Sequence, residues 1–494
     1  MKIFSAAINQ HDHNTYDGVW HNQVERHTRI KKNMWQGCYD NFFYDIAWPE
    51  VNNNDVWGFT YTAGGYWNKD WKRIPWENEL KEILKDYDNY TSSWKNLYDY
   101  LLLDNIYFID HHQSHAIYAF LSSGYKESDI LAIDGGGNSK HTAFFDKNGK
   151  VHDLTYEIPL GWLWGITTRI IGLGGGESSG KTMGLSSYGN FNQEFYDFLE
   201  LCIEECRRRR EMFWDSQILE TMEKHYIADC AYTMQQFTID KIKEVMLQYK
   251  SCDNICIAGG VAYNGYMNEM LTKFYKNVFV PPAVGDEGQS LGTYMHAELM
   301  LNQNIHIPKL DSGKQYDIED NEIDYDRIAQ MIADGKIIGW FQGRSESGNR
   351  ALGNRSILAD PRIHNIKDII NKTIKKREDW RPFAPSVLEE YYKDYFDTFY
   401  PSPYMSRIVK VISDKIPGVT HLDKTARIQT VTKQQNEKFY NLISAFNNIT
   451  GIPMVLNTSF NCQEPIVETP EHALSTFLNT ELDAVVIGSK VIEK

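Results

Sequence analysis

The sequence predicts an α/β protein from the pattern of three segments. Residues 129–146 read as two strands around a glycine turn, whereas residues 254–271 and 278–300 each read as a strand, a glycine turn and a helix. Strands that stop at glycine turns opening helices are typical of α/β proteins, which bind ligands at the ends of their strands. We therefore expect ligands at these turns.

The length predicts more than one domain, because 494 residues exceed what one hydrophobic core usually organises. A polar stretch from Asn302 to Asp324 divides two α/β parts, so we expect domains over 1–310 and 320–494. Residues 34–108 are rich in Trp, Tyr, Asn and Asp and lack a long periodic pattern. They predict an aromatic-packed insertion in the first domain. The sequence shows no internal repeat.

Composition excludes several classes of function. The formal net charge of −15 argues against a general binder of nucleic acid or anionic membranes, since both favour a basic surface. The seven cysteines form no C-x-x-C pair, as expected of idle thiols in a reducing compartment. The N-terminus lacks the apolar core of a signal peptide, and no stretch approaches the roughly 20 apolar residues of a membrane span. We expect a cytoplasmic protein whose partners are small molecules.

Two histidines and two aspartates predict a metal site. His111 and His115 lie four residues apart, which on a helix places both imidazoles on one face. Such a pair alone is more often a polar helix start. Asp134 and Asp286, at two strand–loop junctions, could complete a set of two histidines and two carboxylates. That mixed set suits iron, manganese or zinc better than calcium.

Two glycine turns could hold a nucleotide. Asp134 opens a run of three glycines, and Gly259-Gly260-Val261 is followed by Asn264. Glycine lets backbone amides crowd round phosphate or adenosine, and the asparagine amide could contact ribose or base. A plain hairpin turn explains the Asp134 segment equally well. For the Gly259 segment alone, a strand-to-helix turn without a ligand is the favoured interpretation.

The segment from Gly175 to Thr182 matches the P-loop pattern G-x-x-x-x-G-K-[ST]. In a true P-loop the lysine grips phosphates and the hydroxyl holds magnesium. The residues after Thr182 do not favour a helix, and the strand–loop–helix context is missing. We interpret the match as coincidental, with Lys181 retained as a candidate phosphate contact in the N-terminal site.

The C-terminal half concentrates basic residues in an otherwise acidic chain. They are Arg344, Arg350, Arg355, Arg362, Lys375, Lys376, Arg377 and Arg381. Tight glycine and proline punctuation, as in ALGN and RPFAPS, is unlike a solvated charged helix. Converging arginines and lysines are what ATP and a second phosphate require. Downstream, a strand ends at Asn457 and Ser459, whose amide and hydroxyl suit a phosphate or a carboxylate-like group.

Taken together, the segments resemble the O-carbamoyltransferase family, which includes nodulation carbamoyltransferases and enzymes that carbamoylate aminoglycoside and cephem antibiotics. The resemblance rests on His11-Asp12, VERHTRIK, HHQSHA, DGGG, GKTMGLSSYG, IAGGVAYN, VPPAVGDEGQSLG, GNRALGNRSILADPR, KKREDWRPFAPSV, THLDKTARIQTV and NTSFNCQEPIV. It implies an actin-like (ASKHA-type) N-terminal domain joined to an α/β domain similar to threonylcarbamoyl-AMP synthase. Asn14 and Lys424 depart from the family pattern, which usually has serine and glycine there.

The resemblance also implies a role for each site residue. The metal, Fe²⁺ by resemblance, would be held by His111, His115, Asp134 and Asp286, and adenylate contacts would come from Gly259, Gly260, Val261 and Asn264. In the second site Arg350, Lys375, Arg381 and Ser459 would bind carbamoyl phosphate, with Arg427 and Gln429 nearer an ATP that carries Mg²⁺. Further candidates are His11 as general base and Asp12, Lys181 and Asn457 as substrate contacts.

The implied reaction joins carbamate from carbamoyl phosphate to the α-phosphoryl of ATP, giving carbamoyl-adenylate and pyrophosphate. The carbamoyl group would then pass to a hydroxyl of a sugar, an antibiotic-like metabolite or a hydroxymethylated pyrimidine nucleotide. One rival function is an actin-like or P-loop kinase, which would release ADP instead of AMP. A second rival is a non-catalytic nucleotide-binding protein.

Overall fold

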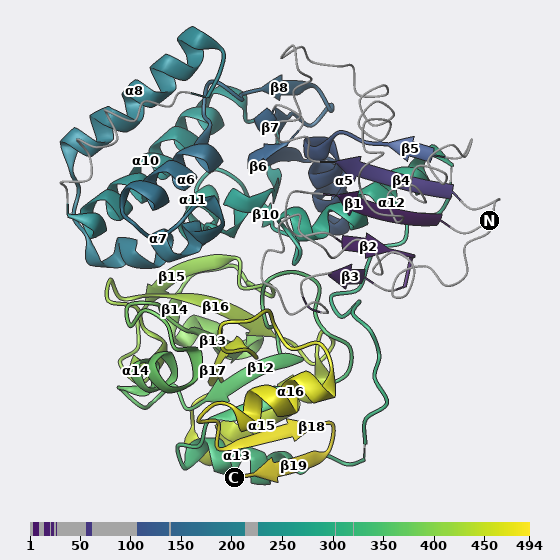
Figure 1. Ribbon diagram of the computed structural model, residues 1–494, viewed down its shortest axis with the longest axis vertical. Coiled ribbons are helices and arrows are strands. Elements are labelled where there is room, and N and C mark those ends of the chain that lie inside the picture. Colours follow the sequence, from purple (N-terminus) through teal and green to yellow (C-terminus); the bar gives the residue numbers. More distant parts are fainter. Residues whose placement is uncertain are drawn as a thin grey trace, which may run out of the picture.

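The computed structural model describes residues 3–8, 14–19, 21–23, 26, 56–61, 106–137, 140–212, 226–301, 303–319 and 321–494. Within these residues the N-terminal region carries two five-stranded sheets and the C-terminal region one nine-stranded sheet. The predicted α/β class is confirmed. In Figure 1 the C-terminal region, green to yellow, lies below the N-terminal region, purple to teal.

The two N-terminal sheets share one topology. The first has the order β3-β2-β1-β4-β5 and the second the order β8-β7-β6-β9-β10. In each, the first three strands pair antiparallel and the last two add in parallel. This duplicated sheet is what the predicted actin-like fold requires. The two sheets share a topology but no sequence repeat, so the duplication could not be recognised from the sequence.

The strands of the first sheet are β1 (Ile3–Ile8), β2 (Asn14–Tyr16), β3 (His21–Gln23), β4 (Val56–Tyr61) and β5 (Ile106–Phe108). Those of the second are β6 (Asp129–Gly137), β7 (Lys140–Phe145), β8 (Val151–Asp153), β9 (Asn254–Ala258) and β10 (Asn277–Phe279). Since β4 and β5 fall within residues 34–108, these parts of the predicted insertion belong to the sheet instead. The rest of that segment lies outside the described residues.

Helices pack on and between these sheets. They are α5 (His111–Ser123), α6 (Leu160–Ile170), α7 (Ser179–Leu185), α8 (Gln193–Arg209), α10 (Ile227–Tyr249), α11 (Gly265–Leu271) and α12 (Gln289–Met300). Helix α5 contacts β6 and β9 of the second sheet and also α12, which covers the first sheet. It therefore lies where the two sheets meet (Figure 1). Among the described residues, no helix combines the length and apolar character needed to cross a membrane.

The C-terminal region is built on a mixed sheet of order β14-β15-β16-β13-β17-β12-β11-β18-β19. Its strands are β11 (Ile338–Phe341), β12 (Arg355–Ala359), β13 (Ala384–Leu388), β14 (Phe396–Asp397), β15 (Arg407–Val411), β16 (Thr425–Val431), β17 (Met454–Ser459), β18 (Ala484–Ile487) and β19 (Lys490–Glu493). The helices are α13 (Tyr325–Ala333), α14 (Ile366–Ile369), α15 (Glu437–Thr450) and α16 (Pro470–Leu478), and a π-helical turn spans Ile370–Lys375. Buried aromatic and aliphatic side chains, including Trp340 and Phe446, form one core beneath them.

The two regions contact each other through α11 and β15. Asn268 donates to the Ser406 carbonyl over 2.7 Å, and Tyr266 donates to the Asp423 carboxylate over 2.7 Å. Arg407 lies 3.5 Å from the carboxylate of Glu269. These contacts bring the C-terminal region against α11.

Candidate functional site

The four predicted metal ligands converge. His111 and His115 lie in the first turns of α5, Asp134 lies in β6, and Asp286 opens a 3₁₀ turn before α12. One ligand atom from each lies within 4.8 Å of every other. We call these four residues the His–Asp group.

The spacing of the His–Asp group fits a metal ion. The Nε2 atom of His115 is 3.2 Å from Asp134 Oδ2 and 3.4 Å from Asp286 Oδ1. That of His111 is 3.2 Å from Asp286 Oδ1 and 3.9 Å from Asp134 Oδ2. Ligands held about 2.1 Å from one tetrahedral ion lie roughly 3.4 Å apart. The donor set and its dimensions therefore suit a divalent transition metal.

Electrostatics hold the His–Asp group together. Burial alone would lower the pKa of His111, but Asp286 and Asp134 outweigh it and raise that pKa to about 10. Burial opposes ionisation of Asp134, yet the two histidines hold the pKa of this carboxyl well below its usual range. The protons on the histidines thus supply the positive charge that a metal cation would otherwise supply to the two carboxylates.

Neighbouring backbone fixes the aspartates. The Gly260 amide donates to Asp134 Oδ2 over 2.9 Å, so the turn after β9 directly abuts the His–Asp group. That turn needs glycine at Gly259, whose φ is +88° and whose missing Cβ would strike the Ile133 carbonyl. Asn14 donates to the Asp286 carbonyl over 2.8 Å and accepts from the Ser290 amide.

The side chain of Asn264 has a structural task. Its oxygen accepts from the Met267 amide and caps α11, and its amide donates to Gln235 over 2.9 Å. Asn268 is similarly engaged, donating to the carbonyls of Ala262 and Ser406. In this conformation both asparagine amides are engaged within the protein, and contact of Asn264 with ribose or base stays a prediction. Gly260 lies next to the His–Asp group.

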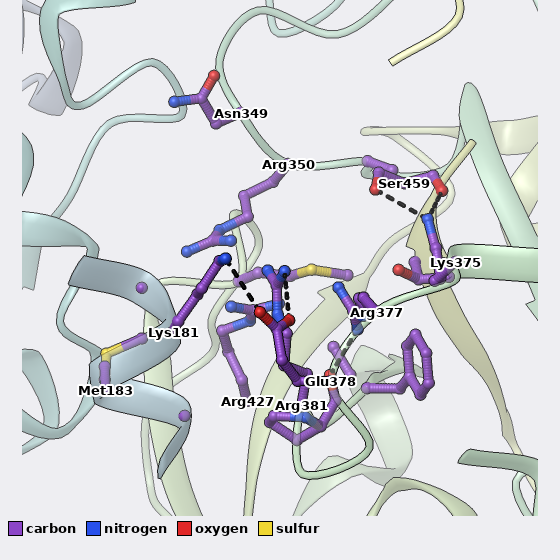
Figure 2. Close-up of a pocket in the computed structure, with 18 of the residues that line it drawn as sticks. Lys181, Met183, Asn349, Arg350, Lys375, Arg377, Glu378, Arg381, Arg427 and Ser459 are labelled. Carbon is purple, nitrogen blue, oxygen red and sulfur yellow. Dashed lines mark hydrogen bonds and ion pairs between the residues drawn. The ribbon is translucent and has the colours of Figure 1, made fainter. Parts of the chain in front are cut away.

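A second site is a cavity of about 600 Å³ between the two regions. Its C-terminal wall includes Asn349, Arg350, Lys375, Lys376, Arg377, Glu378, Arg381, His421, Arg427, Asn457, Thr458, Ser459, Asn461 and Cys462. Its N-terminal wall includes Glu177, Ser178, Gly180, Lys181, Met183, Gly184, Ser187 and Tyr266. The His–Asp group is not part of either wall. Figure 2 shows Arg350, Arg377, Arg381 and Arg427 turned toward one another, and we call this space the arginine cavity.

Like charges face one another in the arginine cavity. Burial, and then the charges of Arg350, Arg377 and Arg381, lower the pKa of Arg427 well below its usual range. Burial, and then Arg381, lower the pKa of Arg377 to about 9. A protein gains nothing from such repulsion unless an anion is bound there. Converging cations of this kind suit an anionic ligand such as phosphate.

Other predicted residues form the cavity's frame. Lys375 is buried and donates to the Ser459 carbonyl and hydroxyl and to both Asn461 oxygens. Beneath the cavity, Gln429 donates to the Leu352 carbonyl, and Asn457 donates to the Ala351 carbonyl and to Gln429. Gln429 is not among the lining residues in this conformation, and its place nearer the nucleotide stays a prediction.

Not every arginine of the cluster converges. Arg355 is buried and donates to the carbonyls of Gln342 and Gly343, and Arg362 forms a bidentate pair with Asp360. Both are structural. Arg377 belongs to the predicted basic cluster but had no predicted role of its own. It does line the cavity.

The P-loop pattern is not a P-loop. Helix α6 and a turn precede Gly175, where a P-loop needs a strand. The expectation that residues after Thr182 leave the helix was partly wrong, because α7 continues to Leu185 before a 3₁₀ turn. Lys181 lines the arginine cavity rather than the His–Asp group. His11 and Asp12 lie outside the described residues.

Comparison with known proteins agrees with the resemblance. Residues 67–295 match the family described as Carbamoyltransferase N-terminus, and residues 329–494 match Carbamoyltransferase C-terminus. Nodulation protein NolNO of Sinorhizobium fredii is 36% identical over 447 residues, covering 79% of this chain and 64% of that protein. This chain thus spans just under two thirds of that relative's length.

Two further similarities differ in strength. The activator of the 2-hydroxyisocaproyl-CoA dehydratase from Clostridium difficile, solved with bound ADPNP, is 11% identical, with 62% of this chain and 99% of that chain covered. Its TM-score of 0.34 is too low to bear on the fold. Nodulation protein NolO of Bradyrhizobium diazoefficiens is 34% identical over 435 residues, covering 78% of this chain and 79% of that protein. With both halves matched and NolO similar over most of its length, this chain belongs to the carbamoyltransferase family.

Proposed function

We propose that this protein is an ATP-dependent O-carbamoyltransferase that makes carbamoyl-adenylate in the arginine cavity and transfers its carbamoyl group at the His–Asp group. The observation that carries the proposal is the convergence of Arg350, Arg377, Arg381 and Arg427 on one interdomain cavity. No described element offers a P-loop for phosphoryl transfer, so the P-loop form of the kinase alternative loses its support. An actin-like kinase needs no P-loop, but it would leave the arginine cavity without a role.

The cavity residues suit adenylate formation. Arginine binds phosphate oxygens with two parallel N–H donors, so Arg350 and Arg381 can hold carbamoyl phosphate while Arg427 faces the ATP phosphates. Mg²⁺ accompanies the ATP. Carbamoyl phosphate reacts with water to give carbamate and inorganic phosphate. A carbamate oxygen then attacks the α-phosphorus, the bond to the β-phosphate oxygen breaks, and pyrophosphate leaves. Fixed positive charges that need not reorganise stabilise the charge on the departing pyrophosphate.

The His–Asp group suits the transfer step. Fe²⁺ is the metal we propose for it, and when bound it would polarise the carbamoyl carbonyl or orient the adenylate phosphate. Gly260 and Asn14 hold the two aspartates at the edge of the turn where adenylate contacts are expected. His11 stays the candidate general base for the acceptor hydroxyl. The acceptor class remains a sugar, an antibiotic-like metabolite or a hydroxymethylated pyrimidine nucleotide, and the cytoplasm is the proposed location.

Product analysis tests this function. The purified chain is incubated with ATP, Mg²⁺ and carbamoyl phosphate, and nucleotides and pyrophosphate are quantified. AMP with pyrophosphate, dependent on carbamoyl phosphate, is expected. ADP would favour the kinase alternative, and no turnover would favour a nucleotide-binding protein. A panel of hydroxyl compounds is then screened for a mass gain of about 43 daltons, one carbamoyl group replacing hydrogen.

A further inference from the structure

An ion pair crosses the arginine cavity. Lys181 Nζ, on α7 of the N-terminal region, lies 2.9 Å from Glu378 Oε1 in the C-terminal region. The other oxygen of Glu378 lies 3.8 Å from Arg381 Nη1. Figure 2 shows the Glu378 carboxylate between Lys181 and Arg381, and all three side chains line the arginine cavity.

Glu378 is unusual in its surroundings. Among the described lining residues only Glu177 and Glu378 carry carboxylates, and Glu177 is an exposed rim residue that accepts from the Gly175 amide. Glu378 by contrast faces the cluster whose members repel one another. A carboxylate there offsets part of that repulsion while no substrate is bound.

The Lys181–Glu378 ion pair is not a strong structural tie between the two regions. The side chains of Lys181 and Glu378 are 32% and 25% exposed, and partly solvated ion pairs contribute little to stability. A polyphosphate carries more negative charge than a carboxylate and accepts several donors at once. It can therefore take Lys181 from Glu378 at small cost.

We infer that Glu378 stands in for the anionic substrate in the empty cavity, and that Lys181 is a phosphate-binding residue supplied by the N-terminal region to the C-terminal site. On binding, the Lys181–Glu378 pair is exchanged for a Lys181–phosphate pair. This inference rests on the proposed function of the cavity. It replaces the expectation that Lys181 acts in the N-terminal site.

Binding of inorganic pyrophosphate to the full-length protein tests the exchange by calorimetry. Lys181→Met should raise the dissociation constant about tenfold, since a charge-assisted bond is lost. Lys181→Arg should restore most of the affinity. Glu378→Gln should lower the dissociation constant about threefold, because the competing carboxylate is gone and Lys181 is released. Glu493→Gln removes the same charge from a comparable ion pair with Lys336 outside the cavity and should change affinity less than twofold.

The two variants should shift the dissociation constant in opposite directions. This result distinguishes the inference from a purely structural role of the Lys181–Glu378 pair. If the pair merely ties the two regions together, both Lys181→Met and Glu378→Gln would lower the melting temperature and weaken binding alike. Shifts in the same direction, or no shift in either variant, would overturn the inference. If the unmutated protein itself fails to bind pyrophosphate, the proposed function of the cavity fails instead.

Discussion

The His–Asp group and the arginine cavity hold charge in opposite ways. In the first, four buried or nearly buried side chains pair opposite charges within 4 Å, all inside the N-terminal region. In the second, like charges from the C-terminal region face one another in a cavity that the N-terminal region closes. The difference indicates opposite kinds of ligand. The donor set of the His–Asp group suits a metal cation in place of protons, and the charge of the arginine cavity suits an anion.

This contrast makes mutations at the two sites diverge in stability. Removing a histidine leaves buried carboxylates without their partner, which is destabilising. Removing an arginine from a cluster of arginines relieves repulsion. The same loss of activity should therefore accompany lower stability at one site and unchanged or higher stability at the other.

The largest effect is expected from Arg350→Ala. Pyrophosphate release should fall at least about a hundredfold, as on removal of a donor that stabilises transition-state charge. The melting temperature should stay or rise, because Arg350 is one of the charges that lower the pKa of Arg427. Arg362→Ala is the matched control for activity, because it breaks the pair with Asp360 and contacts with the Ala333 carbonyl and the Phe446 ring but removes no residue that lines the cavity. A normal rate of release in Arg350→Ala would remove this residue from the site.

A slightly smaller effect is expected from His115→Ala. Carbamoylation of an acceptor should fall roughly a hundredfold with loss of bound metal, as ligand-shell changes do. Pyrophosphate release should persist, since the arginine cavity is separate, and the melting temperature should drop. Metal content is measured by elemental analysis, with His152→Ala, on β8 and 4.0 Å from Asp146, as control. Unchanged metal content would make the histidine pair structural.

After a chelator removes metal, the thermal stability of the protein should depend on pH because of the charge pairs in the His–Asp group. In the metal-free protein the pKa of His111 is raised to about 10, so its stabilising contribution is complete below about pH 6.5, its ordinary value, and is lost as pH rises through 10. The lowered pKa of Asp134 contributes above about pH 4 and is lost in acid. Thermal melts of chelated protein should fall by a few degrees or more between pH 7 and 10. Metal-loaded protein, whose histidines are already neutral, should lack that decline.

The sequence predicted the His–Asp group well because its members are fixed by local rules. Two histidines four apart on a helix share a face, and aspartates at the end of a strand and at a glycine turn point to a common edge. No such rule reports on direction in an arginine-rich stretch. Arg355 turns inward to backbone carbonyls and Arg377 turns into the cavity, although both share the same cluster.

The features that could not be predicted from the sequence are those that depend on tertiary contacts. Strands β4 and β5 are short, and aromatic and polar residues flank them in the sequence. No alternating pattern therefore indicated them. Lys181 reaches the arginine cavity only because α7 and α11 contact the C-terminal loops. Asn264 and Gln429 have the chemistry of ligand contacts, yet neighbours far along the chain already use their amides.

One contact links the two sites and offers the finest test of the comparison. The Arg350 guanidinium lies 4.9 Å above the ring of Tyr263, which follows the glycine turn at the His–Asp group. The Tyr263 hydroxyl donates to the carboxylate of Glu287, the neighbour of Asp286, and Asn349 donates to the same carboxylate over 3.3 Å. These contacts favour Tyr263 as a positioning residue for Arg350, held from the side of the His–Asp group.

Tyr263→Leu and Tyr263→Phe separate the two contributions of this ring. A desolvated cation–π contact contributes about 1–2 kcal/mol, so Tyr263→Leu should raise the KM for carbamoyl phosphate about tenfold with little change in metal content. Tyr263→Phe keeps the ring and loses only the hydrogen bond to Glu287, so its KM should rise at most about threefold. If phenylalanine is as harmful as leucine, the hydroxyl, and with it the Glu287 side of the link, positions the arginine. If neither variant changes KM, Arg350 is held by the cavity alone, and the two sites are independent in substrate binding.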